Sequence, residues 1–119
     1  MRELQTALKA LSDETRLRIL KLIQGKECCV CEVMQALDIS QTRASRNLNI
    51  LYNAGFLKMR KDGLWSLYSL NDDTPPAYFP ELISAVDKAM SDNPKAIEDK
   101  VRLNNAERVG PACVRKCSR

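Results

Sequence analysis

The five cysteines are the residues of this sequence with the clearest capacity for chemistry. Three lie within four positions, at Cys28, Cys29 and Cys31, and two lie near the C-terminus, at Cys113 and Cys117. An odd number with three so close together is a poor pattern for a disulfide framework. Neighbouring cysteines in an intracellular chain indicate binding of a soft metal ion, or redox chemistry, instead.

The sequence contains no histidine. This excludes histidine-based acid–base catalysis, Ser-His-Asp triads and every histidine-ligated metal site. A small reductase or thiol transferase also lacks support, because the cysteines have no histidine partner and no strand–helix context for a Cys-x-x-Cys redox site. We therefore expect a binding protein with no organic cofactor, and not an enzyme.

The length of 119 residues favours one domain with a folded core, since 45% of the residues are hydrophobic and 29% are charged. Residues 1–6 lead into a charged helical pattern and lack the apolar core of a signal peptide. No apolar run approaches the roughly 20 residues that cross a bilayer. These features predict a cytoplasmic protein with no membrane partner.

The hydrophobic spacing predicts four helices in the first half of the chain. The first carries Leu4 and Leu8, and the second begins after a cap at Ser12 or Asp13 and ends near Gly25. The third runs from about residue 29 to residue 37. A tight connection over residues 38–40 leads to the fourth, with Ser40 as its N-cap and Gly55 after its end.

After Gly55 the period changes to that of two strands, over residues 56–60 and 64–70. Residues 61–63 include Asp-Gly, a strong hairpin-turn signal. A fifth helix follows, and Asn93-Pro94 predicts the start of a sixth, with Lys95/Asp99 and Glu98/Arg102 as charge pairs. The thin apolar face of this last helix indicates loose packing. We expect a folded domain over residues 1–92 and a C-terminal extension, which carries Cys113 and Cys117, over residues 93–119.

Basic charge is concentrated between residues 40 and 61, which include five basic residues and no acidic ones, whereas the whole chain has a net charge of only +4. A tight turn between two helices followed by a hairpin describes a winged helix-turn-helix, mainly α with a β-hairpin wing. The outward face of its recognition helix and the wing would contact bases and phosphates. The predicted DNA-binding residues are Gln41, Thr42, Arg43, Ser45, Arg46, Asn49, Lys58, Arg60 and Lys61.

Several stretches resemble the ArsR/SmtB family of metal-responsive repressors: LKALSDETRLRIL at 8–20, ECCVCEV at 27–33, LDISQ at 37–41, ASRNL at 44–48, AGFL at 54–57 and the hairpin at 61–68. The resemblance covers about residues 4–90. It implies a homodimer that holds an imperfect palindrome in its own promoter and is released by a bound metal.

In the family the first and fifth helices pair across the dimer axis. The apolar residues suited to this role are Leu4, Leu8, Phe79, Leu82, Ile83, Val86 and Met90. The same face of the fifth helix could pack on its own subunit's core, and both roles are compatible.

The arsenic-responsive branch of the family carries Cys-Val-Cys at the start of the helix-turn-helix and a third cysteine three residues later. Cys29 and Cys31 match the first two positions, but Met34 occupies the third, and a thioether is a weak ligand. The resemblance implies As(III) or Sb(III) as inducer, and these ions favour three thiolates.

The third sulfur could come from Cys28 or from the tail pair Cys113 and Cys117 of either subunit. In a helix Cys29 and Cys31 do not share a face, so joint use of the three neighbouring cysteines requires a departure from helical geometry.

Two other signals fit the same fold. A site of four thiolates would suit Cd(II) or Pb(II), and an oxidant or persulfide could link cysteines that lie close together. A single cysteine often serves as a small buried hydrophobe. Three within four positions make that interpretation a poor one here.

Overall fold

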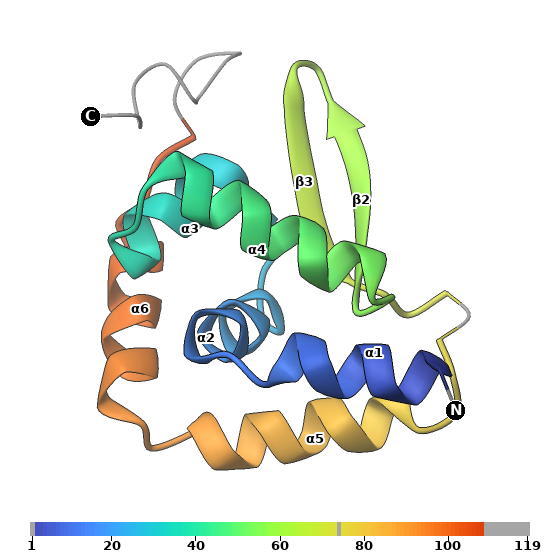
Figure 1. Cartoon of the computed structure of the whole chain (residues 1–119). Helices are drawn as coiled ribbons and strands as arrows, with labels where there is room; N and C mark the ends of the chain where they lie inside the picture. The colour runs from blue at the N-terminus through green and yellow to red at the C-terminus, as the bar shows by residue number, and fades with distance from the viewer. Residues whose placement is uncertain (1, 74, 109–119) are drawn as a thin grey trace.

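The computed structural model describes residues 2–73 and 75–108, and it has the expected order of helices and hairpin (Figure 1). One short strand, β1, was not expected from the sequence. The elements are α1 (Arg2–Leu11), α2 (Glu14–Ile23), β1 (Cys28–Cys29), α3 (Val30–Leu37), α4 (Gln41–Asn53), β2 (Leu57–Asp62), β3 (Trp65–Leu70), α5 (Phe79–Met90) and α6 (Pro94–Asn104).

The expected caps begin three of the helices. Asp13, Ser40 and Asn93 each accept a hydrogen bond from the backbone N–H three residues later, at 3.1, 3.2 and 3.1 Å. Pro94 follows Asn93 at the first position of α6. Such caps satisfy N–H groups that have no partner within the helix, so they fix where each helix starts.

The helix-turn-helix consists of α3, the turn at residues 38–40 and α4. Asp38 takes a left-handed conformation with φ of 56°, which ends α3 and lets the chain reverse. The inward stripe predicted for α4, at Ala44, Leu48 and Leu51, is fully buried. The opposite side of α4 is therefore the outward face.

The wing is part of a three-stranded antiparallel sheet in the order β1-β3-β2. The β2–β3 hairpin projects from the body beside α4 (Figure 1). The turn occupies residues 63 and 64 and not the expected 61–63, because β2 continues through Asp62 and pairs it with Trp65. Gly63, with φ of 64°, takes the first central position of the two-residue turn, where a residue with a side chain would be strained.

Three residues of the expected dimer face lie in the subunit's own core. Phe79, Val86 and Met90 are buried, and Phe79 stacks on Phe56 with 4.5 Å between ring centroids. The other four remain at least partly exposed, and they are Leu4, Leu8, Leu82 and Ile83. The apolar face of α5 thus has an inner part that packs in the subunit and an outer part at its surface.

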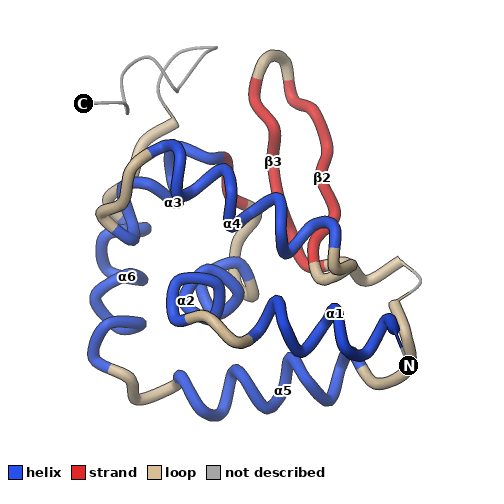
Figure 2. The backbone as a smooth tube through the Cα atoms, viewed as in Figure 1, coloured by secondary structure: helices blue, strands red, loops and turns tan. Residues whose placement is uncertain are grey.

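The expectation of a loosely packed α6 is wrong. This helix packs along α2 and α3 (Figure 2), and its Asp99 is 1% exposed. Arg18 donates two hydrogen bonds to Asp99, at 2.7 and 2.9 Å, and Arg102 donates a third at 3.0 Å. Asp99 is thus bound by the two arginines and not by Lys95 as expected. Lys95 instead contacts Glu14 at 2.9 Å. The expected Glu98/Arg102 pair is present at 3.4 Å.

The two arginines also tie α6 to the end of α3. Arg102 Nε donates to the carbonyl of Ala36 at 2.6 Å, and Arg18 donates to the carbonyl of Leu37 at 3.4 Å. These carbonyls belong to the last turn of α3, where backbone carbonyls have no hydrogen-bond partner within the helix. Across the described ranges, no helix has the length and apolar character needed to cross a membrane.

Replacing Asp99 tests whether α6 is part of the fold. We expect Asp99→Ala to lower the free energy of unfolding by about 3–5 kcal/mol, because it leaves two partly buried arginines without their shared carboxylate. Glu98→Ala is the matched control on the same helix. It removes an exposed pair, so about 0.5 kcal/mol or less is expected. Urea unfolding measures both, and equal effects would show that Asp99 does not hold α6.

Candidate thiol site and nucleic-acid interface

Cys29 and Cys31 form a close pair of buried thiols, with their Sγ atoms 2.9 Å apart and in hydrogen-bond contact. Cys29 is the N-cap of α3, with extended backbone angles of −87° and 171°, and the helix begins only at Val30. The expectation that α3 starts at about Cys29 is thus corrected. The departure from helical geometry that joint use of the cysteines requires is already present, and it turns Cys29 Sγ toward Cys31.

Cys28 faces away from this pair. Successive residues of a strand point to opposite sides, and Cys28 and Cys29 are the two residues of β1. Cys28 Sγ donates to the carbonyl of Lys26 at 3.3 Å and packs in the main core, as does Met34. Cys113 and Cys117 lie outside the described residues. Among the described residues, no group of three cysteine, aspartate or glutamate side chains is arranged to hold a metal ion.

Side chains of the wing pack against the thiol pair. Cys29 pairs with Leu67 across β1 and β3, and Leu67 and Trp65 pack against the two thiols. The hydrogen bond with Cys31, together with burial, raises the pKa of Cys29, and burial raises the pKa of Cys28 to about 12. Cys28 and Cys29 are therefore protonated thiols at neutral pH.

Glu32 is a positioning residue that sequence reasoning missed. Its Oε1 accepts a hydrogen bond from Cys29 N at 2.9 Å, and its carboxylate also contacts Lys26 at 3.2 Å and Arg108 at 3.0 Å. Burial opposes its ionisation, but these three donors outweigh burial and lower its pKa. A glutamate three residues after an N-cap is half of the capping-box signature, which was the available signal.

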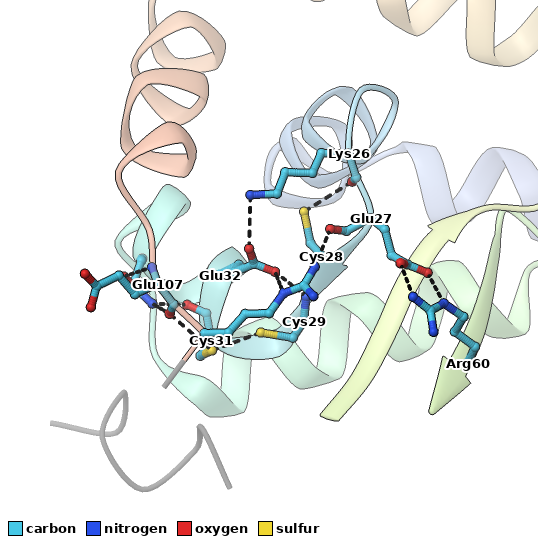
Figure 3. A network of polar contacts seen from close by, with 10 residues as sticks. Lys26, Glu27, Cys28, Cys29, Cys31, Glu32, Arg60 and Glu107 are labelled. Carbon is cyan, nitrogen blue, oxygen red and sulfur yellow. Dashed lines mark hydrogen bonds and ion pairs between the residues drawn. The ribbon is translucent and has the colours of Figure 1, made fainter. Parts of the chain in front are cut away.

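The polar contacts continue from Glu32 to the wing (Figure 3). Glu27, directly before β1, accepts two hydrogen bonds of 2.8 Å from the Arg60 guanidinium on β2. Ladder bonds also join β1 to β3. The segment that carries the cysteines is therefore attached to the wing at two points, by backbone and by side chain.

The outward face of α4 carries the predicted DNA-binding residues. Thr42, Arg46 and Asn49 are exposed, and Gln41 and Ser45 are half-buried. The Arg43 guanidinium instead reaches back to donate to Thr15 Oγ1 at 3.0 Å.

Arg16 holds α4 in place from α2. Its guanidinium donates to Asn47 Oδ1 at 2.9 Å and to the carbonyl of Ala10 at 2.7 Å. The buried Asn47 in turn donates to the carbonyl of Arg43 on its own helix at 2.9 Å. Sequence analysis did not identify Arg16 or Asn47, because neither residue changes the hydrophobic spacing from which the helices were predicted.

The wing is less basic than the acid-free stretch of sequence suggested. Lys58 contacts Asp72 at 2.6 Å and Asp73 at 3.6 Å, and Arg60 is held by Glu27. The acids come from segments outside residues 40–61. Lys61 donates to Ser66 Oγ at 2.8 Å and remains exposed near the turn.

A helix-turn-helix that exposes polar side chains on its second helix, followed by a β-hairpin wing, defines a winged helix-turn-helix transcriptional regulator. Residues 13–59 match the arsR family of bacterial regulatory proteins. The chain is 42% identical over 81 residues to MJ1325 of Methanocaldococcus jannaschii, described as an HTH-type transcriptional regulator, and covers 86% of that protein. The chain belongs to the arsR family of DNA-binding transcriptional regulators, and these are not enzymes.

Two further proteins illustrate the likeness. The chain is 43% identical to the arsenic resistance transcriptional regulator ArsR1 of Pseudomonas putida, in a match of 63% of this chain and 62% of that protein. Its fold is similar to the homodimeric winged helix-turn-helix domain of Mb0332 from Mycobacterium bovis, with a TM-score of 0.64, 25% identity, and 78% of this chain and 82% of that one covered.

The raised pKa of Cys28 makes stability depend on alkaline pH. In the unfolded chain the thiol ionises near its ordinary pKa of 9.0, whereas in the folded chain its pKa is raised to about 12. Stability is thus retained below pH 9 and lost as pH rises through this window, by up to about 1.4 kcal/mol per pH unit for one thiol.

Urea unfolding under reducing conditions, between about pH 8 and 10.5, measures this loss. Cys28→Ala should be less stable than the parent at neutral pH but should fall less steeply as the pH rises. Equal slopes would mean that Cys28 ionises as readily in the folded protein as in the unfolded chain.

Proposed function

We propose that this protein is a homodimeric transcriptional repressor that leaves its operator when As(III) or Sb(III) binds to Cys29 and Cys31. The single observation that carries this proposal is the 2.9 Å approach of two thiols at the first turn of the helix-turn-helix. Thiolates are soft ligands that suit thiophilic ions. The sequence has no histidine, so it offers no imidazole ligands for other transition metals. The name of the Pseudomonas relative, an arsenic resistance regulator, supports the same inducer.

The binding reaction balances without an oxidant. Arsenite in neutral water is As(OH)₃, and each thiol that forms an As–S bond gives its proton to a departing hydroxide, which leaves as water. Three As–S bonds replace three As–O bonds, and arsenic stays in the +3 state. Because the proton leaves with the hydroxide, the protonated Cys29 thiol is a competent starting state.

Binding must move Cys29 away from Cys31. With metal–sulfur bonds of about 2.3 Å, two sulfurs on one ion stand roughly 3.5 Å apart, farther than the present contact. Cys29 belongs to β1, which is bonded to the wing, and Cys31 belongs to α3. A bound ion therefore shifts the wing relative to the helix-turn-helix, which is our proposed cause of DNA release.

The operator contacts follow from the exposed side chains of α4 and the wing. Thr42, Arg46 and Asn49 would read the major groove, with Gln41 and Ser45 at the N-terminal turn, and Lys61 would contact the adjacent backbone. Lys58, Arg60 and Arg43 would first have to leave their protein partners. A symmetric dimer on this interface would favour an imperfect palindrome.

The dimer would form through α1 and the outer part of α5. Leu8 is 49% exposed and Leu82 and Ile83 are half-buried, so these residues have apolar surface left for a partner. The homodimeric Mycobacterium domain supports this assembly. On this proposal residues 1–92 bind DNA and dimerise, and residues 93–119 add the tail cysteines.

A thiol-redox signal is the second candidate, and the same 2.9 Å contact favours it. An oxidant could convert the two thiols into a disulfide with loss of two electrons and two protons. A site of four thiolates would suit Cd(II) or Pb(II), and the tail pair Cys113 and Cys117 could add two sulfurs to those of Cys29 and Cys31. Release of DNA by peroxide, reversed by a reductant, would support the redox candidate over arsenite.

Serine variants test the inducer site directly. We expect micromolar arsenite to release wild-type protein from its operator in a gel shift, and Cys29→Ser and Cys31→Ser to remain bound, because each loses one of the paired sulfurs. Cys28→Ala is the matched control and should respond, since its sulfur faces the core. Normal release of the Cys29→Ser variant would contradict the site, and cadmium and peroxide belong in the same assay.

Arg46→Ala tests the recognition helix. We expect at least tenfold weaker operator binding and, if the guanidinium contacts a phosphate, a salt slope reduced by about 0.9. Lys100→Ala removes an exposed cation from α6 and is the control. Fluorescence anisotropy across a salt series gives both quantities. Equal affinities for the two variants would exclude Arg46 from the interface.

A further inference from the structure

The ion pair between Arg60 and Glu27 joins the wing to the chain that carries the thiols (Figure 3). We call residues 27–29 the cysteine segment. The Arg60 guanidinium donates from Nε to Glu27 Oε2 and from Nη2 to Glu27 Oε1, both at 2.8 Å. Two parallel hydrogen bonds between a guanidinium and a carboxylate fix the relative position of the two groups. The pair therefore holds the cysteine segment against β2.

The ion pair and the thiol pair meet in one row of the sheet. Cys29 pairs with Leu67 of β3, and Leu67 pairs with Arg60 of β2, so a single row of partners crosses all three strands. Partners in such a row project from the same face of the sheet. Glu27, two residues before Cys29, reaches this row through Arg60. The cysteine segment thus carries one thiol of the pair and the carboxylate that binds Arg60.

A phosphate of DNA would compete with Glu27 for Arg60. The Arg60 side chain is 58% exposed, so a phosphate can approach it, although Glu27 occupies the donor fork in the free protein. A guanidinium binds a phosphate with the same two-bond geometry that it uses for a carboxylate. Arg60 lies on the wing and is one of the residues predicted to contact DNA. The fork cannot make both sets of bonds at once.

We propose that Glu27 couples operator binding to the thiol site, because Glu27 and a DNA phosphate exchange as the partner of Arg60. This inference rests on the proposed function and names a positioning residue for release. In the free protein Glu27 binds Arg60. On the operator a phosphate takes its place and the carboxylate is set free. Glu27 binds neither the ion nor the DNA itself and acts through Arg60.

The exchange makes the ion and the operator oppose each other. While Glu27 holds Arg60, the cysteine segment is attached to the wing by ladder bonds and by this pair. An ion that needs both sulfurs binds more tightly when the segment that carries one of them is held in place. A phosphate on Arg60 removes one attachment and so weakens ion binding. Because coupling is reciprocal, the ion weakens operator binding by the same factor.

The ion pairs of Lys58 supply a matched comparison on the same strand. Lys58 contacts Asp72 at 2.6 Å and Asp73 at 3.6 Å, and both aspartates are exposed. They would compete with a phosphate for Lys58 as Glu27 does for Arg60. They follow β3, however, and lie outside the cysteine segment. Their removal should therefore raise operator affinity without changing the effect of the ion.

Operator affinity, measured by fluorescence anisotropy without and with saturating arsenite, tests the coupling. The ratio of the two affinities is the release factor. Glu27→Gln keeps the shape of the side chain and removes its charge. We expect it to raise affinity without arsenite by about two- to fivefold, the worth of one exposed bidentate pair, and to lower the release factor by a similar amount. Asp72→Asn/Asp73→Asn should raise affinity and keep the release factor of wild type.

The Arg60→Ala background decides whether Glu27 acts through the guanidinium. There Glu27→Gln should change neither operator affinity nor release factor, since nothing remains to exchange. Equal changes in both backgrounds would overturn the inference. So would a Glu27→Gln variant with weaker operator binding, or with the release factor of wild type. Failure of arsenite to release wild type would overturn the proposed function and the coupling with it, while the operator affinity of Glu27→Gln would still report the exchange at Arg60.

Discussion

The structure depends on the change from strand to helix at Cys29. This residue ends β1, whose ladder bonds reach the wing, and also caps α3, the first helix of the DNA-binding motif. Its extended backbone angles direct Sγ to within 2.9 Å of Cys31. The hydrogen bond from Cys29 N to the Glu32 carboxylate stabilises this extended conformation. The two sulfur atoms therefore lie at the junction between the wing and the helix-turn-helix.

A second set of interactions links the C-terminal part of the chain to this junction. The buried Asp99 attracts one arginine from α2 and one from α6, and both arginines also satisfy carbonyls at the end of α3. Asp99 is 1% exposed, and these arginine donors supply its carboxylate with hydrogen bonds in place of water. The result is that α6 is tied by these contacts to the first helix of the helix-turn-helix.

Electrostatic pairing modifies the surface that faces DNA. Lys58 and Arg60 have acidic partners from elsewhere in the chain, whereas Arg46 is exposed on the recognition helix. On the proposal that Arg60 contacts the operator, exchange of Glu27 for a phosphate as its partner would loosen the wing from the segment that carries the cysteines.

The sequence by itself determined the elements and the class of fold. Caps at Asp13, Ser40 and Asn93, the inward stripe of α4 and the Asp-Gly signal near the hairpin act through neighbours a few residues away, so local patterns reveal them. It also identified Cys29 and Cys31 as the pair to examine. Local patterns could not supply β1, a two-residue strand that exists only because β3 lies beside it.

Only the tertiary structure decided which thiols converge. Cys28, Cys29 and Cys31 are equivalent neighbours in the sequence, but the alternation of β1 sends Cys28 into the core and Cys29 toward Cys31. The partners of Glu32, Asp99 and Arg60 come from segments that are distant in the chain, and no spacing rule encodes them. Charge and burial depend on what the fold brings together, and this is why three neighbouring cysteines divide into one core residue and one close pair.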